Sequence, residues 1–177
     1  MSIRQLSSRI VYRNPWMTVR EDEVERDNGQ PGIYGVVEKH DSAVILPLDR
    51  DHIYLVEQFR YPIGRRSLEF PQGSLEAAGL EPQAIARQEL IQETGIVAAS
   101  LELLGAFNIA VGYSNQRDYA FLATGLTLGP RTPDREEHDL VLHRLSLNEF
   151  QEKIRSNAID DAQTLAAWAF YLARYGR

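Results

Sequence analysis

The stretch "QGSLEAAGLEPQAIARQELIQETGI", residues 72–96, decides the fold. Its second half predicts a helix over residues 81 to about 94. Pro82 suits the first helical turn, because its missing N–H group would have no helical partner there. Gly95 suits the position just past the helix end, where the backbone often turns left-handed. The sequence therefore predicts a short helix held between a glycine-bearing loop and a glycine stop.

The predicted helix carries two glutamates, Glu89 and Glu93, four residues apart. Residues at this spacing lie one above the other on the same helical face. Two like charges placed in this way destabilise a helix by about 0.2–0.5 kcal/mol. Either the two carboxylates share a hard divalent cation such as Mg²⁺, or they belong to a solvated acidic surface. The spacing alone leaves both explanations open.

The composition limits the class of protein. A chain of 177 residues that is 44% hydrophobic can bury one core, with room for a small appendage. The net charge of −6 argues against a broad surface for nucleic acids, which requires clustered positive charge. The absence of cysteine excludes disulfides and thiol catalysis. No stretch is typical of a signal peptide or a membrane span, so we expect a soluble, cytoplasmic protein that does not bind membranes.

The order of the predicted elements indicates an α/β fold with a mixed sheet. Strand patterns fill the first third, with a hairpin turn at Asn28-Gly29. The run "SAVILPLD", residues 42–49, is typical of a strand buried on both faces. More strands follow the acidic helix, and two helices end the chain. We expect helices on both faces of the sheet, with residues 1–39 as a small antiparallel β unit and 40–177 as the main domain.

The stretch from "EFPQG" (residues 69–73) to the end of the helix resembles the Nudix box, Gly-x5-Glu-x7-Arg-Glu-U-x-Glu-Glu-x-Gly-U, where U is aliphatic. Gly73 matches the first glycine of the pattern. The second half of the pattern is matched in register by Glu89, Leu90, Glu93, Gly95 and Ile96. Residues 55–73 and 160–175 are similar to the corresponding segments of ADP-ribose pyrophosphatases, and the resemblance covers most of the chain from about Arg9. It implies the Nudix fold, an α/β/α sandwich, with an added N-terminal β unit.

The box departs from the family pattern in three places. Gln88 replaces the arginine, Gln92 replaces the first glutamate of the Glu-Glu pair, and the loop after Gly73 is two residues longer. An amide carries no charge and holds a cation less well than a carboxylate does. The proposed metal site therefore depends on Glu89 and Glu93.

The resemblance implies a pyrophosphohydrolase that uses Mg²⁺, with Mn²⁺ as an alternative. Such an enzyme cleaves ADP-ribose or a related nucleoside diphosphate sugar to a nucleoside monophosphate and a sugar phosphate. The implied metal ligands are Glu89, Glu93 and the backbone carbonyl of Gln72, and Glu89 counts among the catalytic residues. The implied general base is Glu136 or Glu137, in the acidic stretch "PDREEHDLVL" (residues 133–142). The alternative reading of that stretch is a solvated surface loop.

The resemblance also suggests substrate contacts. Arg60 is expected either to contact the phosphates or the terminal ribose of the substrate, or to be a surface charge at a strand end. Arg65 and Arg66 are further candidates for binding phosphate groups. Glu69 is expected either to accept hydrogen bonds from ribose hydroxyls or to pair with one of these arginines. Trp16 is expected either to stack on the base or to pack within the N-terminal unit.

Family members use the N-terminal unit to reach a second subunit, so the resemblance implies a homodimer. Two alternatives to a nucleotide-sugar hydrolase remain open. One is a pyrophosphohydrolase of dinucleoside polyphosphates or RNA ends, and the other is a catalytically impaired Nudix-fold protein that only binds nucleotides.

Overall fold

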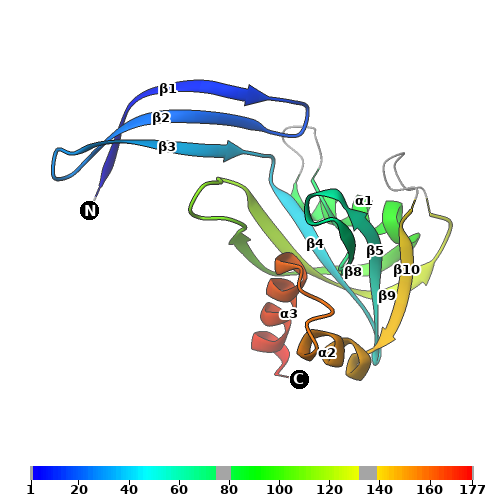
Figure 1. The fold of residues 1–177 in the computed structure, drawn as a ribbon. Helices are drawn as coiled ribbons and strands as arrows, with labels where there is room; N and C mark the ends of the chain where they lie inside the picture. Colours follow the sequence, from blue (N-terminus) through cyan, green and yellow to red (C-terminus); the bar gives the residue numbers. More distant parts are fainter. Residues whose placement is uncertain (1, 75–80, 132–138, 177) are drawn as a thin grey trace.

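The computed structural model describes residues 2–74, 81–131 and 139–176. The N-terminal part forms a three-stranded antiparallel sheet in the order β1-β2-β3 (Figure 1). Its strands are β1 (Ile3–Arg13), β2 (Thr18–Arg26) and β3 (Pro31–Glu38). Gly29 adopts φ 77° in the turn between β2 and β3, which confirms the predicted hairpin.

A second, mixed sheet of seven strands forms the main body. Its order is β10-β5-β4-β9-β8, with β6 paired to β5 and β7 paired to β4. The pair β4·β9 is parallel, and the other pairs are antiparallel. The strands are β4 (Ser42–Asp49), β5 (His52–Arg60), β6 (Arg65–Glu69), β7 (Gln72–Gly73), β8 (Ile96–Asn108), β9 (Arg117–Leu128) and β10 (Val141–Ser146). The mixed sheet predicted from the sequence is confirmed.

Helices cover both faces of this sheet. They are α1 (Pro82–Thr94), α2 (Leu147–Arg155) and α3 (Ala162–Tyr175), with a 3-10 turn, η1, at Tyr61–Ile63. Successive residues of a strand point to opposite faces. Ile45 of β4 accordingly packs in the cluster that contains Leu90 of α1, while its neighbour Leu46 packs in the cluster that contains Trp168 of α3. The sandwich expected from the resemblance is therefore present, and β4, which is buried over residues 42–47, lies at its centre.

The start of α3 is tied to the segment that leads into β7. Asp161 is the N-cap of α3, and its side chain accepts a hydrogen bond from the backbone N–H of Thr164 at 2.8 Å. The hydroxyl of Thr164 accepts a hydrogen bond from the backbone N–H of Phe70 at 2.9 Å. This connection, made between residues far apart in the chain, fixes the beginning of α3 beside β7.

The N-terminal sheet extends away from the main body (Figure 1). Every residue of β1 is exposed, including Ile3, Leu6, Ile10, Val11 and Tyr12. The sheet contacts the loop between β8 and β9, where the backbone N–H of Val37 donates to the carbonyl of Tyr113 at 2.7 Å. None of the helices in the described part of the chain has the length and apolar character needed to cross a membrane.

Candidate functional site

The two helical carboxylates lie against the short strand β7. The backbone N–H of Gln72 donates a hydrogen bond to Oε2 of Glu93 at 3.0 Å. Gly73 lies so close to Glu89 that a Cβ atom on it would lie 2.5 and 2.6 Å from the two carboxylate oxygens. Both side chains are buried: Glu89 is 8% exposed and Glu93 is 1% exposed. The predicted common face exists, and it is buried against β7 and not solvated.

This arrangement fits a divalent cation. Two buried carboxylates require a compensating charge, and carboxylate oxygens are ligands that Mg²⁺ and Mn²⁺ prefer. No group of three or more acidic or histidine side chains within the described ranges is arranged to hold a metal. Mg²⁺ does not need such a group, because it is usually held by one or two carboxylates together with water and substrate phosphates. The pair Glu89 and Glu93, with the neighbouring carbonyl of Gln72, is a donor set of that kind.

The two glutamines that depart from the box pattern lie on another face of α1. Gln88 is exposed and Gln92 is half-buried, and both line a shallow surface hollow together with Arg87. Neither lines the cleft that Gln72 and Gly73 of β7 border. The substitutions therefore leave the buried acidic face of the helix intact.

A cleft of about 510 Å³, referred to below as the central cleft, lies beside β7. Its walls come from the β3–β4 connection, the end of β5 with η1, strands β6 and β7, the β8–β9 loop and the start of α3. Its cationic and amide side chains are Lys39, Arg60, Arg65, Gln72, Gln116 and Gln163. Because Gln72 and Gly73 both line the cleft and contact the buried carboxylates, the proposed metal site and the cleft adjoin.

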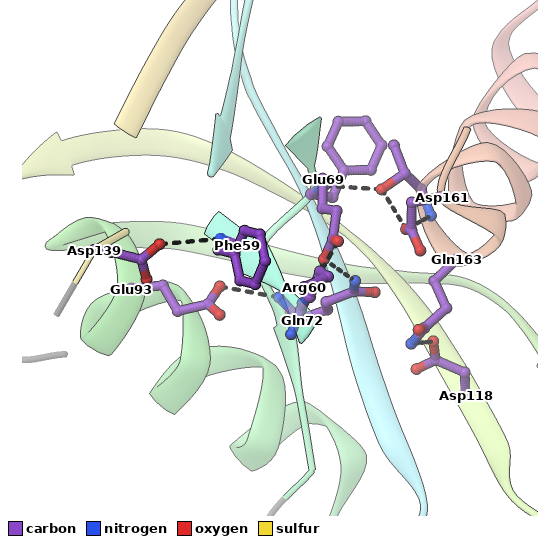
Figure 2. A network of polar contacts seen from close by, with 11 residues as sticks. Phe59, Arg60, Glu69, Gln72, Glu93, Asp118, Asp139, Asp161 and Gln163 are labelled. Atoms are coloured by element: carbon purple, nitrogen blue, oxygen red, sulfur yellow. Dashed lines mark hydrogen bonds and ion pairs between the residues drawn. The ribbon is translucent and has the colours of Figure 1, made fainter. Parts of the chain in front are cut away.

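Arg60 and Glu69 form an ion pair in the wall of this cleft (Figure 2). Nε of Arg60 donates to Oε1 of Glu69 at 3.0 Å, and a second guanidinium nitrogen donates to Oε2. Burial alone would raise the pKa of Glu69, but the hydrogen bonds and charge of Arg60 outweigh burial and lower it. Burial also opposes the charge of Arg60, yet the contacts with Glu69 leave its pKa raised. Of the two roles expected for Glu69, the structure shows the pairing with an arginine.

The side chain of Gln72 joins this pair. Its Nε2 donates to Oε2 of Glu69 at 2.7 Å, while its Oε1 is buried and has no hydrogen-bond partner in the described part of the chain. The sequence pointed only to the backbone carbonyl of this residue. The side chain could not be anticipated, because its orientation depends on the pairing of Glu69 with Arg60.

Two aspartates at the cleft, the buried Asp118 and the half-buried Asp161, were not identified as site residues from the sequence. Asp118 of β9 is fully buried, and its carboxylate accepts hydrogen bonds from Nε2 of Gln163 at 2.7 Å and from the backbone N–H of Tyr119 at 2.9 Å. Burial raises the pKa of Asp118 to about 6. Burial likewise raises the pKa of Asp161, which lines the cleft. For Asp118, the signal available in the sequence was an acidic residue directly before the apolar run at residues 119–123 of β9.

The two adjacent arginines of β6 point to opposite sides. Arg65 lines the central cleft and forms an ion pair with Asp160. Arg66 does not line it, and pairs with Glu57 at 2.9 Å and with Asp139 at 2.9 Å. The alternation of a strand accounts for this difference. Of the two, the structure brings only Arg65 to the cleft.

Trp16 lies in the turn between β1 and β2 and is 54% exposed. It lines a smaller hollow of about 300 Å³, which shares Lys39 with the central cleft. Trp16 is therefore not packed into the N-terminal unit, and it faces a hollow beside the main site.

Glu136, Glu137 and His138 lie outside the described residues. Asp139, which follows them, is described, and its side chain accepts a hydrogen bond from the backbone N–H of Phe59 at 3.0 Å (Figure 2). Phe59 precedes Arg60 of the cleft wall. The acidic segment therefore ends beside the strand that carries Arg60.

Comparison with known proteins agrees with this geometry. Residues 38–168 match the NUDIX domain, and residues 3–37 match the nucleoside diphosphate sugar hydrolase N-terminal domain. The chain is 32% identical over 149 residues to an ADP-ribose pyrophosphatase of Bacillus subtilis, an alignment that covers 82% of this chain and 80% of the relative.

Two further relatives are similar over most of the chain. An ADP-ribose pyrophosphatase of Mycobacterium tuberculosis is 29% identical over 163 residues, covering 91% of this chain and 79% of the relative. A methanol dehydrogenase activator of Bacillus methanolicus is 28% identical over 159 residues, covering 89% and 85%. The crystal structure of an ADP compounds hydrolase superposes with a TM-score of 0.84 at 22% identity, covering 98% of this chain and 93% of that one, which supports the fold. With a matching domain over most of its length and the buried Glu89–Glu93 pair in place, the chain belongs to the Nudix hydrolases and resembles the ADP-ribose pyrophosphatases among them.

Proposed function

We propose that this Nudix pyrophosphohydrolase cleaves ADP-ribose or a related nucleoside diphosphate sugar, yielding a nucleoside monophosphate and a sugar phosphate. One observation carries the proposal: the two buried carboxylates of α1 meet β7 at the edge of a cleft that also presents Arg60, Arg65 and Lys39. The lining also contains Glu69 and Asp160, which pair with the two arginines, so the charge of a diphosphate would be neutralised mainly by the proposed cation, with the arginines and Lys39 as directional contacts. The names of the ADP-ribose pyrophosphatase relatives support this substrate class.

In the proposed site, Glu89, Glu93 and the carbonyl of Gln72 would hold a divalent cation. When bound there, Mg²⁺ or Mn²⁺ would supply charge neutralisation for the diphosphate and activation of the attacking water. Arg65, which lines the cleft, and Arg60, whose guanidinium is fixed by Glu69, orient the phosphates. A general base must lie within hydrogen-bond reach of the water, and Glu136 or Glu137 is proposed for this role.

Trp16 and Arg66 are proposed to act outside the metal site. Trp16 is proposed to stack on the nucleobase, since its ring is exposed at a hollow that shares Lys39 with the cleft. Arg66 is proposed to hold the end of the acidic segment, because it contacts both the side chain and the carbonyl of Asp139 at 2.9 Å.

A second copy of the chain is the proposed partner of the N-terminal sheet. A three-stranded sheet needs an apolar face packed against something to be stable, and β1 leaves its apolar side chains exposed. Sedimentation velocity is expected to show a homodimer that Ile10→Asp weakens. A wild-type monomer at micromolar concentration would contradict this assignment.

The substrate is tested by a panel assayed with Mg²⁺, with Mn²⁺ and with a chelator. The panel contains ADP-ribose, ADP-glucose, GDP-mannose, a dinucleoside tetraphosphate and a triphosphorylated RNA. Turnover of ADP-ribose to AMP and ribose phosphate that stops with chelator is the expected result. Preference for the tetraphosphate or the RNA, or ligand-induced thermal stabilisation without any product, would overturn the proposal.

A further inference from the structure

Two glutamine side chains of the central cleft are each anchored on a buried acid. Nε2 of Gln72 donates to Glu69 at 2.7 Å, and Nε2 of Gln163 donates to Asp118 at 2.7 Å. Glu69 is 3% exposed and Asp118 is fully buried. An ionised carboxylate only accepts hydrogen bonds, so each amide turns its nitrogen toward the acid and its oxygen elsewhere.

For Gln72, two contacts determine the orientation of the amide: the one between Glu69 and Arg60, and the one between Gln72 and Glu69. Glu69 cannot turn away, because both of its oxygens accept hydrogen bonds from Arg60. Reversing the amide of Gln72 would place its oxygen against an oxygen of Glu69, and two acceptors repel each other. Figure 2 shows the side chain of Gln72 extending from β7 toward the start of α3, where Asp161 and Gln163 lie. The fold therefore sets the direction of Oε1.

The Oε1 atom of Gln72 is buried and has no partner in the part of the chain that the structure describes. An unsatisfied buried acceptor is costly, so a ligand that supplies a donor there gains affinity, and a ligand that lacks one loses it. Phosphate oxygens are acceptors at neutral pH and are disfavoured at this point. A hydroxyl group is the donor that suits it.

The backbone of the same residue identifies which part of the substrate comes near. The N–H of Gln72 holds Glu93 of the proposed metal site, and that site engages the diphosphate. A glutamine side chain reaches only a short way from its own backbone. The groups within its reach are those bonded directly to the diphosphate, which in a nucleoside diphosphate sugar are sugar rings on either side.

We propose that Oε1 of Gln72 accepts a hydrogen bond from a hydroxyl group of a sugar bonded to the diphosphate, and that this contact determines selectivity for sugar-bearing substrates. This inference rests on the proposed function and names a determinant of its substrate class. Glu69 acts through Gln72 and is a positioning residue. The hydroxyl belongs either to the nucleoside ribose or to the terminal sugar.

The test compares kcat/KM for three substrates in wild type and Gln72→Met, which keeps the backbone and the chain length but removes the acceptor. The substrates are ADP-ribose, its analogue without the 2′- and 3′-hydroxyls on the adenosine, and an ADP ester of a simple pentyl alcohol. Gln83→Met is the matched control, because Gln83 is exposed on the outer face of α1 and its partner among the described residues is the carbonyl of Leu101. Gln72→Ala is assayed in parallel, so that a folding defect in one variant does not decide the outcome.

Wild type is expected to prefer ADP-ribose by roughly 10- to 100-fold over the analogue that lacks the relevant hydroxyl. Both Gln72 variants should bring that ratio close to one, Glu69→Gln should lower it, and Gln83→Met should leave it unchanged. The analogue that shows the effect identifies the sugar. A ratio that Gln72→Met leaves unchanged for both analogues overturns the inference, even if all rates fall together. Absence of turnover of any nucleoside diphosphate ester by wild type would instead refute the proposed function.

Discussion

Gly73 and Glu89 are in such close contact that no side chain fits between them. A Cβ atom on Gly73 would lie 2.5 Å from one carboxylate oxygen and 2.6 Å from the other. Both residues belong to the stretch at residues 72–96 that resembles the Nudix box. The glycine is therefore required by the position of the acid, and the length of the loop between them does not prevent the contact.

Gly73→Ala is expected to displace the carboxylate of Glu89 and to lower Mg²⁺-dependent turnover by about 10- to 100-fold, as changes beside a metal ligand do. The fold should persist, because the added methyl group meets a side chain and not backbone. Rates measured across a Mg²⁺ titration check this. Gly112→Ala is the control, since its Cβ would meet nothing within 4 Å. Equal activity of the two variants would contradict the assignment of Glu89.

Removing the charge of Arg60 should destabilise the protein through Glu69. Arg60→Met leaves a carboxylate whose side chain is 4% exposed without its cation. We expect a loss of about 1–3 kcal/mol in the free energy of unfolding, below the full cost of breaking a buried pair because the Arg60 side chain is 36% exposed. Urea unfolding measures the loss, and Arg9→Met, at an exposed pair with Glu21, should stay within about 0.5 kcal/mol.

The loss of stability in Arg60→Met should depend on pH. In wild type the pKa of Glu69 lies below its ordinary value of 4.5, so the pair stabilises the fold above that pH, and this stabilisation is lost as pH falls. The difference between wild type and Arg60→Met should therefore be largest at neutral pH and shrink in acid. A difference that is constant between pH 3 and pH 7 would contradict the role of the pair, on the linkage argument.

Asp118 should make the free energy of unfolding depend on pH with the opposite sign to Glu69. Its pKa is raised from 3.8 to about 6, so between these values the unfolded state loses a proton that the folded state keeps. Its contribution to the free energy of unfolding therefore falls as pH rises from about 4 to about 6, by an amount on the order of 3 kcal/mol. Asp118→Asn should lack this fall, whatever its overall stability. Parallel stability profiles for the two proteins over this range would show that Asp118 does not titrate as stated.

Gln92→Glu tests the most conspicuous departure from the family pattern. Gln92 is half-buried at the hollow on the outer side of α1, away from the contacts that Glu89 and Glu93 make with β7. Activity is expected to be equal or higher in the variant. A large loss in initial rate at saturating Mg²⁺ would mean that the amide has a specific role.

The sequence predicted features that depend on local signals. The helix with Pro82 at its start and Gly95 after its end, the buried strand at 42–49 and the Asn28-Gly29 hairpin are all present, because each is specified by its own residues. The shared face of Glu89 and Glu93 followed from helix geometry alone.

The polar lining of the cleft could not be predicted in the same way. Asp118 and Gln163 are 45 residues apart, and they meet only because α3 packs across the sheet. The choice between Arg65 and Arg66 depends on which face of β6 looks into the cleft. The Oε1 atom of Gln72, which has no partner among the described residues, takes its direction from two further contacts, between Glu69 and Arg60 and between Glu69 and Gln72 itself. Such features arise from tertiary packing, which single-sequence patterns do not encode.

The most direct measurement is the Mg²⁺ dependence of ADP-ribose hydrolysis by wild type and Glu93→Gln, with products identified by phosphorus NMR. The glutamine can still accept the hydrogen bond from the backbone of Gln72, so the variant should unfold at nearly the wild-type temperature. Wild type should release AMP and ribose 5-phosphate in a Mg²⁺-dependent reaction, and the variant should lose at least about 100-fold in rate, a barrier increase of about 3 kcal/mol. Wild-type rates and wild-type Mg²⁺ dependence in folded Glu93→Gln would contradict the account.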